Sequence, residues 1–436
     1  MNNKIGFWSV FAMVTGSQIG TGVFMLPASL APYGTYSLVG WLISGMGAIA
    51  LALVFAKLCS RFPRTGGPHV YIQNTYGPSF AFFVGWTYWV ISWVSTTAVV
   101  VTAITYLTPF IGDKGSEIYL ALEITLLLAI TILNLKGLKA AGLIEIVLTL
   151  LKFLPLLVIS VIALCFFDKS NFSVASDVAS LPTSKILGQV TLLTLWGFIG
   201  LETATTPAGS VENARKTIPR AIIFGTMCVA LLYFINSLGI MGLIPADALA
   251  KSKAPYVDAA QIMFGGSWHL VVSLIASIVC IGTLNAWMMT SGQIVLGLAE
   301  DGLMPKFFGK KNNKDAPYGG ILTSCVGIIP LLILTASENI SAQIVSIIDF
   351  SVTAFLFVYL SCGLAHIKLI SPAEKFKFVH YLYGFISIIF CLWIIYETPF
   401  KTLAIASLFV ASGVPVYLLW YRPQVRSRSF LNDKNL

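Results

Sequence analysis

The stretch TGSQIGTGVFMLPA, residues 15–28, lies within a run from residue 5 to residue 56 that contains no Asp, Glu, Lys or Arg. It places glycines at positions 16, 20 and 22 and mixes them with Ser17, Gln18 and Thr21. A glycine in a helix interior costs about 1 kcal/mol relative to alanine. A run apolar enough to cross a membrane therefore contains a segment that does not favour a regular helix.

The composition indicates a polytopic membrane protein. Of 436 residues, 57% are hydrophobic and 10% are charged, whereas a soluble domain carries about 25% charged residues. We expect one transmembrane domain over residues 1–436. The start of the chain has no cleavable signal pattern, so the first apolar segment is expected to be retained.

Apolar runs bounded by charged residues, Pro and Gly predict an all-α fold with twelve membrane spans. The expected spans are 7–31, 36–58, 80–109, 118–135, 141–167, 185–211, 219–243, 267–299, 318–336, 342–368, 379–396 and 400–421.

The positive charges are distributed unevenly between the loops. With the N-terminus in the cytoplasm, the inner side holds 20 of the Lys and Arg residues, namely Lys4, Lys57, Arg61, Arg64, Lys136, Lys139, Arg215, Lys216, Arg220, Lys306, Lys310, Lys311, Lys314, Lys368, Lys375, Lys377, Arg422, Arg426, Arg428 and Lys434. The outer side holds 6, namely Lys114, Lys169, Lys185, Lys251, Lys253 and Lys401, and Lys152 lies within a span. Because cytoplasmic loops are rich in Lys and Arg, both termini are predicted to be cytoplasmic. The net charge of +9 then needs no nucleic-acid partner.

The residues that commonly bind metals form no recognisable site. The seven cysteines are scattered through apolar runs without a CxxC pair, and the four histidines lie at or near loops without clustering. Buried cysteines of this kind are usually small hydrophobic residues. We expect no metal and no cofactor.

Residues 16–22 allow two interpretations. Gly16 and Gly20 have the small-xxx-small spacing that lets helices pack closely in lipid. Alternatively, the segment is unwound and its backbone binds a polar ligand inside the protein. A second such segment, LTLWGFIGLETATTPAGSVEN (193–213), has Gly197, Gly200 and Pro207. Two interrupted spans at corresponding positions favour a transporter site near the membrane midplane. Half-helix N-termini suit a carboxylate and free carbonyls suit an ammonium, which together describe an amino-acid site.

Three motifs carry a resemblance to a known family. GSQIGTGVFMLPA (16–28), LWGFIGLE (195–202) followed by VENARKTIPRA (211–221), and NAWMMTSGQIVLGLAEDGLMPKFF (285–308) resemble the amino acid–polyamine–organocation superfamily. They are most similar to its basic amino acid/polyamine antiporter branch, which exchanges arginine for agmatine or ornithine for putrescine. The resemblance implies a LeuT-like fold with a five-plus-five inverted repeat at about 7–167 and 185–368, two additional helices at about 379–421, and discontinuous spans one and six.

The resemblance also implies a set of site residues. It places Ser17, Gln18, Gly20, Thr21 and Gly22 around the substrate carboxylate and amine, Trp196, Ile199 and Glu202 along and across the cavity, Trp287 against the substrate side chain, and Tyr88, Trp93 and Thr96 in the remaining wall. For each aromatic residue, packing in the core or against lipid is the alternative. Arginine-selective members carry an amide side chain where this chain has Thr96, which puts arginine specificity in doubt.

Two ionisable residues lie deep in predicted spans, where charge is costly and usually functional. Glu202 is expected to hold the unwound segment by hydrogen bonds or to carry a proton, with a purely structural carboxyl as the alternative. Lys152 lies about 16 Å along span five. By resemblance to proton-coupled members, its ammonium is predicted to replace a sodium ion, contacting carbonyls of residues 16–20 and hydroxyls near Thr290 and Ser291. A permanently charged structural lysine is the alternative. Glu145 and Asp349 are expected near the membrane interfaces.

The function predicted from these features is secondary active transport of amino acids or related polyamines. The chain would act as an antiporter or as a proton-coupled permease using Lys152, in a bacterial inner membrane, and the resemblance suggests a homodimer. A membrane-embedded enzyme is one alternative, but the sequence has no HExxH, GxSxG or P-loop motif. A channel is the other, and paired interrupted spans favour alternating access over an open pore.

Overall fold

A computed structural model describes residues 4–112, 114–252, 254–336, 340–371 and 376–421, with side chains from residue 347 onward in the fourth range. Within this part the regular structure is helical apart from one isolated bridge between Ile5 and Val211. Six cations of the topology prediction, Lys253, Lys375, Arg422, Arg426, Arg428 and Lys434, and the start of the tenth expected span lie outside the described residues or side chains.

The helices follow the apolar runs of the sequence closely. The longer ones are α1 (Phe7–Gln18), α2 (Thr21–Leu30), α3 (Tyr36–Arg61), α5 (Pro78–Val94), α6 (Thr96–Thr105), α8 (Ser116–Asn134), α9 (Leu138–Ala163), α11 (Thr183–Leu195), α12 (Ala214–Leu243), α15 (Trp268–Glu300), α16 (Tyr318–Thr335), α17 (Ile340–Leu369), α18 (Lys377–Glu397) and α19 (Phe400–Ala411). The remaining α-helices are α4 (Pro68–Tyr76), α7 (Thr108–Ile111), α10 (Ser176–Ala179), α13 (Ala246–Leu249), α14 (Pro255–Phe264) and α20 (Gly413–Val416).

Eleven of the twelve expected spans are apolar helical segments long enough to cross a membrane in the described part of the chain. The expected span 185–211 differs, because α11 ends at Leu195 and gives way to the short 3₁₀ turns Trp196–Phe198, Thr203–Thr205 and Ala208–Ser210. Its glycines, threonines and Pro207 favour turns over a continuous helix. The twelfth span and the inverted repeat stay predictions.

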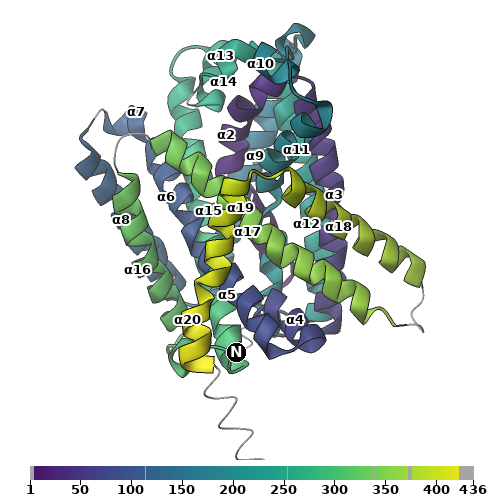
Figure 1. The fold of residues 1–436 in the computed structure, drawn as a ribbon. Helices are drawn as coiled ribbons and strands as arrows, with labels where there is room; N and C mark the ends of the chain where they lie inside the picture. Colours follow the sequence, from purple (N-terminus) through teal and green to yellow (C-terminus); the bar gives the residue numbers. More distant parts are fainter. Residues whose placement is uncertain (1–3, 113, 253, 337–339, 372–375, 422–436) are drawn as a thin grey trace, which may run out of the picture.

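The first and third spans form the centre of the bundle. The windows within 7–33 and 78–105 are 83% and 94% buried, whereas the window within 400–421 is 11% buried. Helix α1 packs against α9, α12 and α15, while α18 and α19 pack on the outside against α3, α17 and α5. Figure 1 shows α8 and α16 together at one side of the bundle and α18 at the other.

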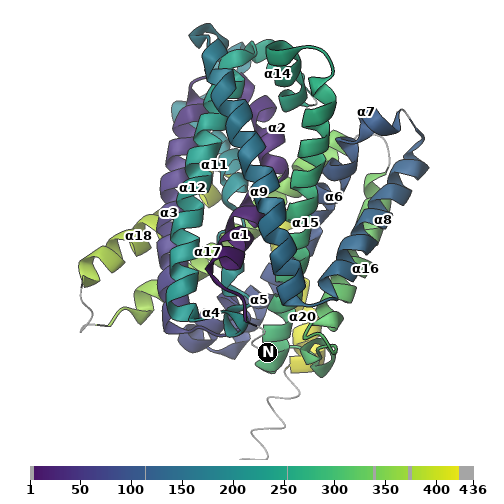
Figure 2. The ribbon, with the colours of Figure 1, turned by 180° about the vertical axis from the view of Figure 1, so that it is seen from behind.

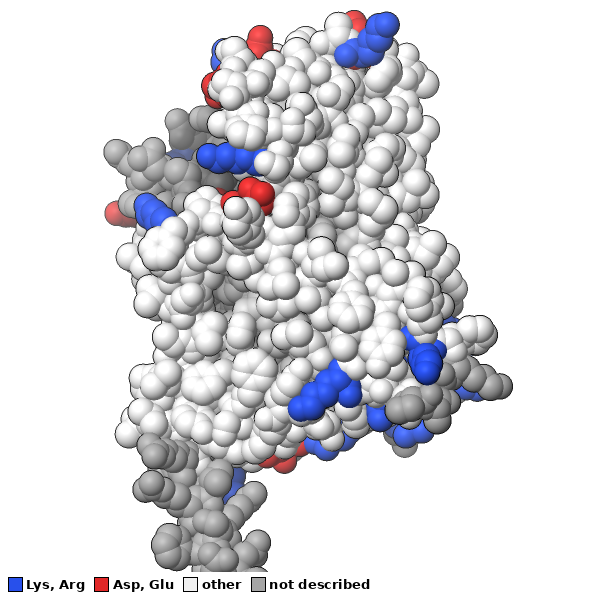
Figure 3. Space-filling view, turned by 45° about the vertical axis from the view of Figure 1, so that its right-hand side comes forward, with Lys and Arg blue, Asp and Glu red and all other residues white. Residues whose placement is uncertain are grey.

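The two ends of the molecule carry different elements. The described N-terminal residues and α4 lie at the lower end in Figure 1, and α10, α13 and α14 lie at the upper end. Figure 3 shows a broad white band between the coloured charged residues of the upper and lower parts of one face. An uncharged band of this kind is what the hydrocarbon core of a bilayer requires.

Candidate functional site

The first span is interrupted at the glycine-rich segment. Helix α1 ends at Gln18, Ile19 is extended with φ −81° and ψ 95°, and Gly20 has φ −142° and ψ −140° before α2 begins at Thr21. At the start of α2, Val23 N donates to Gly20 O at 3.3 Å, while the N–H groups of Thr21 and Gly22 have no acceptor among the described residues. Their position deep in the bundle makes them donors for a negatively charged group.

The carbonyls on the other side of this break are occupied by side-chain donors. The donors and their acceptors are Lys152 Nζ on Gly16 O at 2.8 Å, Trp287 Nε1 on Ser17 O at 3.3 Å, Tyr233 Oη on Gln18 O at 2.8 Å and Thr283 Oγ1 on Ile19 O at 2.6 Å. The expectation that the break offers free carbonyls is therefore wrong for residues 16–19. Three surrounding helices, α9, α12 and α15, supply the hydrogen bonds that the helix end lacks.

The interruption of span six lies directly against that of span one. Ile199 is extended, and Gly200 has φ +108°, a backbone conformation that favours glycine. The Ser17 hydroxyl lies 2.9 Å from the Gly200 carbonyl and 3.0 Å from Thr203 Oγ1. A Cβ at Gly200 would lie 2.7 Å from Ser17 Oγ, so this contact also requires glycine.

A small cavity of about 20 Å³ lies at the junction of the two breaks. It is lined by Ser17, Gln18, Gly20, Thr21, Gly22, Ser95, Val99, Trp196, Ile199, Thr283 and Trp287. Eight of these residues belong to the predicted substrate set, and Ser95, Val99 and Thr283 do not. The volume suffices for a water molecule, so a larger ligand requires side chains of the wall to move.

Two polar side chains of the cavity wall, Gln18 and Trp196, differ in how their hydrogen-bonding groups are satisfied. Gln18 Nε2 donates to Val14 O at 3.1 Å. Gln18 Oε1 is buried and has no hydrogen-bond partner among the described residues. A buried acceptor without a partner costs about 1–3 kcal/mol. Trp196 Nε1 donates to Thr21 Oγ1 at 3.3 Å, which links the two interrupted spans across the cavity.

Four predicted substrate residues lie outside this cavity wall. Tyr88 packs on Phe355, with ring centroids 6.0 Å apart. Trp93 faces α16, where a Cβ at Gly327 would lie 2.8 Å from its ring. The Thr96 hydroxyl, at the start of α6, donates to Ser92 O near the end of α5 at 2.6 Å, so this hydroxyl bonds to the backbone and does not line the cavity.

Glu202, the fourth, is buried behind the Gly200 turn. The Tyr359 hydroxyl donates to Glu202 Oε2 at 2.6 Å. Glu202 therefore joins the broken span to α17 beside the cavity. Whether Glu202 holds the unwound segment or carries a proton stays a prediction.

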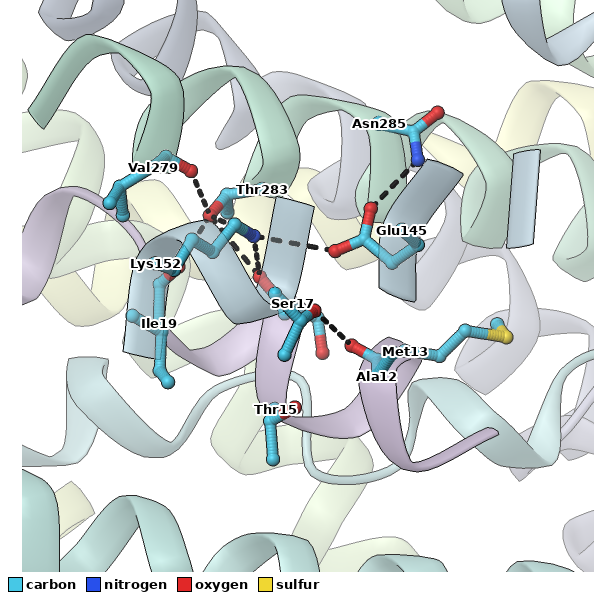
Figure 4. A network of polar contacts seen from close by, with 12 residues as sticks. Ala12, Met13, Thr15, Ser17, Ile19, Glu145, Lys152, Val279, Thr283 and Asn285 are labelled. Carbon is cyan, nitrogen blue, oxygen red and sulfur yellow. Dashed lines mark hydrogen bonds and ion pairs between the residues drawn. The ribbon is translucent and has the colours of Figure 1, made fainter. Parts of the chain in front are cut away.

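Lys152 lies at the back of the first break (Figure 4). Besides Gly16 O, its ammonium lies 3.3 Å from Glu145 Oε1 and 3.4 Å from Thr283 Oγ1. Glu145 Oε2 in turn accepts a hydrogen bond from Asn285 Nδ2 at 2.7 Å. Lys152 and Glu145 have no exposed side-chain surface, so the structure contains a fully buried ion pair between residues two helical turns apart on α9.

One expectation about this region is wrong. Thr290 and Ser291 do not contact Lys152: Ser291 Oγ lies 2.5 Å from Ser324 Oγ, and Thr290 Oγ1 has no partner among the described residues. Thr283 takes their place, two turns earlier on α15. Glu145 is buried, because α1 and α15 both pack against α9, and its depth relative to the membrane interfaces stays a prediction. Its spacing of seven residues from Lys152, which places both on one helix face, is the signal that sequence reasoning missed. Asp349, which is also predicted to lie near a membrane interface, is half-buried on α17.

Glycines make room for this ion pair. A Cβ at Gly16 would lie 2.0 Å from Glu145 Oε1, and a Cβ at Gly282 would lie 2.3 Å from Lys152 Cε. The glycine at position 16 therefore serves the ion pair as well as the helix break. No group of three or more His, Cys, Asp or Glu side chains suited to a metal occurs among the described residues.

Comparison with known proteins places the chain in a family. The family model described as amino acid permease matches residues 5–421. The chain is 31% identical over 424 residues to the putrescine transporter PotE of Haemophilus influenzae, covering 95% of this chain and 97% of that protein. It is 29% identical over 337 residues to the cadaverine/lysine antiporter of Escherichia coli, covering 77% and 76%, and 27% identical over 422 residues to the putrescine transporter PotE of Escherichia coli, covering 95% and 96%. These matches confirm the resemblance drawn from the three motifs, and the chain belongs to the amino acid permease family.

Proposed function

We propose that this chain is a secondary transporter that exchanges a basic amino acid for a diamine by alternating access around the cavity between the two interrupted spans. The observation that carries the proposal is that Thr21 and Gly22, whose backbone N–H groups have no acceptor among the described residues, line the same cavity as Gln18, whose Oε1 has no donor there. The N–H groups suit a carboxylate and the amide oxygen suits an ammonium. The relatives named for putrescine and for cadaverine/lysine support the same substrate class.

The two tryptophans of the cavity suit the cationic side chain of such a substrate. Trp287 is buried and held by its hydrogen bond to Ser17 O, while Trp196 is partly exposed and bonded to Thr21. An ammonium over a Trp face gains about 0.5–2 kcal/mol. Thr96 is directed to the backbone, which supports lysine, ornithine or a diamine over arginine as substrate.

Lys152 supports a sodium-independent mechanism. Its ammonium contacts the Gly16 carbonyl, where a free cation would otherwise bind, and Glu145 balances its charge. Proton-coupled uptake through Lys152 is the second mechanism within this proposal, since the pair is the buried ionisable unit closest to the first break. A bacterial inner-membrane location, cytoplasmic termini and a homodimer complete the proposal as predictions.

The end of the molecule that holds the N-terminus is closed. Gly66 N donates to Thr206 O at 2.8 Å, Ile5 N donates to Ser210 O at 2.9 Å, and Arg64 forms an ion pair with Asp301. The first two contacts join span six to the loop between α3 and α4 and to the chain start, and the third joins that loop to the end of α15. Release of substrate at this end would require them to open, as alternating access demands.

The test is uptake of labelled lysine, ornithine, arginine, putrescine and cadaverine into proteoliposomes. Exchange predicts saturable uptake only into vesicles preloaded with amino acid or diamine. Uptake into empty vesicles driven by an inward proton gradient, and abolished in Lys152→Ala, would replace exchange by proton symport. Non-saturable flux would indicate a channel, and no flux of any of these compounds would refute the substrate class.

A further inference from the structure

A second pocket lies at the N-terminal end of the bundle, away from the transport cavity. It measures about 620 Å³ and is bounded by the α8–α9 loop, by α9, by the loop between α15 and α16, and by Ser210 of the interrupted sixth span and Gln293 of α15. Four lysines, Lys136, Lys139, Lys311 and Lys314, line it. Asp315 is the single acidic residue among the described residues that line the pocket. The pocket is therefore strongly positive.

The two lysine-bearing loops are joined to each other. Asn312 Nδ2 donates to Leu135 O at 2.8 Å. Gly137 has φ +102°, and a Cβ there would lie 2.3 Å from the Lys314 carbonyl. Backbone contact this close fixes the spacing of Lys136 and Lys139 relative to Lys314. The concave basic surface is thus a built feature of two packed loops.

Three of the four pocket lysines have no ion-pair partner among the described residues. Lys311 lies 3.4 Å from Glu300, and both side chains are largely exposed. No ion pair is found for Lys136, Lys139 or Lys314 in the part of the chain that the structure describes. Three like charges held around one pocket repel each other, so an anion bound between them lowers the energy.

An exposed apolar stripe leads away from the pocket along α9. Leu143 lines the pocket, and the exposed side chains of Leu143, Val147, Leu150, Leu154 and Val158 follow one another at helical spacing. Figure 2 shows α9 running along the outer side of the bundle. From Leu143 to Val158 the stripe covers about 22 Å, more than the roughly 15 Å of one leaflet's hydrocarbon.

We propose that this pocket binds the phosphate of an anionic phospholipid, with the lipid's acyl chains lying along the α9 stripe. The basic pocket matches the headgroup, and the adjoining apolar face matches the chains. Basic pockets between membrane helices take anionic lipid headgroups by this combination. A free phosphate ion would contact the lysines but not the apolar stripe on α9. The stripe therefore favours a phospholipid, whose acyl chains would cover it, as the occupant. The site is separate from the transport cavity and does not depend on the transported substrate.

The experiment measures lipid binding to the purified full-length protein in detergent. Phosphatidylglycerol, phosphatidylcholine with the same chains, and inorganic phosphate are titrated, with lipid adducts followed by native mass spectrometry and stability by thermal unfolding. The pocket variant is Lys136→Gln/Lys139→Gln/Lys314→Gln. The matched control, Lys4→Gln/Lys306→Gln/Lys310→Gln, removes the same charge from exposed positions outside the pocket.

We expect phosphatidylglycerol to bind and stabilise the wild type and the control. Each lysine near an anionic headgroup contributes about fivefold in affinity, so the pocket variant should lose on the order of a hundredfold. The single variant Lys314→Gln, with about a fivefold loss, keeps the test available if the triple variant folds poorly. Equal binding to all variants, or equal binding of phosphatidylcholine, would overturn the proposal. Equal stabilisation by inorganic phosphate would replace the lipid by a free anion.

Discussion

The buried pair of Lys152 and Glu145 gives the sharpest quantitative prediction. Their charged atoms lie 3.3 Å apart and neither side chain is exposed. At an effective dielectric constant of about 20, Coulomb's law gives about 5 kcal/mol of attraction between unit charges at this distance. Removing one partner leaves a buried charge alone, which costs about 3–5 kcal/mol, whereas replacing both by neutral groups of similar size is often nearly neutral.

The perturbations are Glu145→Gln, Lys152→Met and their combination. In Glu145→Gln the new side chain keeps an oxygen for the amide of Asn285, which in the wild type bonds to Glu145 Oε2. We expect each single variant to lose about 3–5 kcal/mol in free energy of unfolding and the double variant to lose less than the two losses combined. The assay is reversible unfolding of the four proteins by SDS in mixed micelles, analysed as a double-mutant cycle.

A surface pair supplies the matched control. Lys311 and Glu300 lie 3.4 Å apart, almost the same distance, but their side chains are 41% and 45% exposed. Their coupling energy should stay below about 1 kcal/mol. If the buried pair couples no more strongly than the surface pair, the two side chains do not interact as charges, and the argument that the Lys152 ammonium takes the place of a free cation fails.

Two further predictions concern the transport cavity. Gly200→Ala should abolish exchange and lower the free energy of unfolding by about 1–3 kcal/mol, because the new side chain would sit at a positive φ and clash with Ser17. The control Gly77→Ala, at φ +88° but with open space around the new Cβ, should retain exchange. Trp287→Leu should raise the KM for lysine or cadaverine by about 2- to 30-fold through loss of the cation–π contact. The control Trp268→Leu, on the exposed start of α15, should leave the KM unchanged. If either cavity variant affected transport no more than its control, the assigned site would be contradicted.

The spans and the two breaks could be predicted from the sequence because their signals are local. Runs of apolar residues identify membrane helices without knowledge of their neighbours. The glycines at positions 16, 20 and 22, with Gly197 and Gly200, mark the interruptions for the same reason. The first signal depends on side-chain hydropathy over about 20 consecutive residues, and the second on backbone preferences within a few residues.

The side chains that contact each other from different helices could not be predicted with the same accuracy. Such contacts depend on the position of one helix along the axis of its neighbour, which the sequence of either helix does not give. The sequence predicts a contact of Lys152 with Thr290, whereas the structure shows it with Thr283, seven residues earlier on the same helix. Seven residues are two turns, so the face was correct and the depth was wrong by about 10 Å. The contact of Glu145 with Lys152 is likewise missing from the sequence prediction, because it depends on the lateral packing of α1 and α15 against α9.

The capped carbonyls at the end of α1 constrain how the transporter can move. Donors on α9, α12 and α15 occupy the carbonyls of residues 16–19. Each neutral hydrogen bond contributes about 0.5–1.5 kcal/mol, and the bond from a charged donor about 1.5–3 kcal/mol. A tilt of α1 alone would lose all four, so we expect α1 to move together with these helices or only when substrate binding at α2 offsets the loss. Amide hydrogen exchange in α1 should therefore rise in Lys152→Met and fall when substrate binds. Unchanged exchange in both cases would show that these hydrogen bonds do not hold α1 in place.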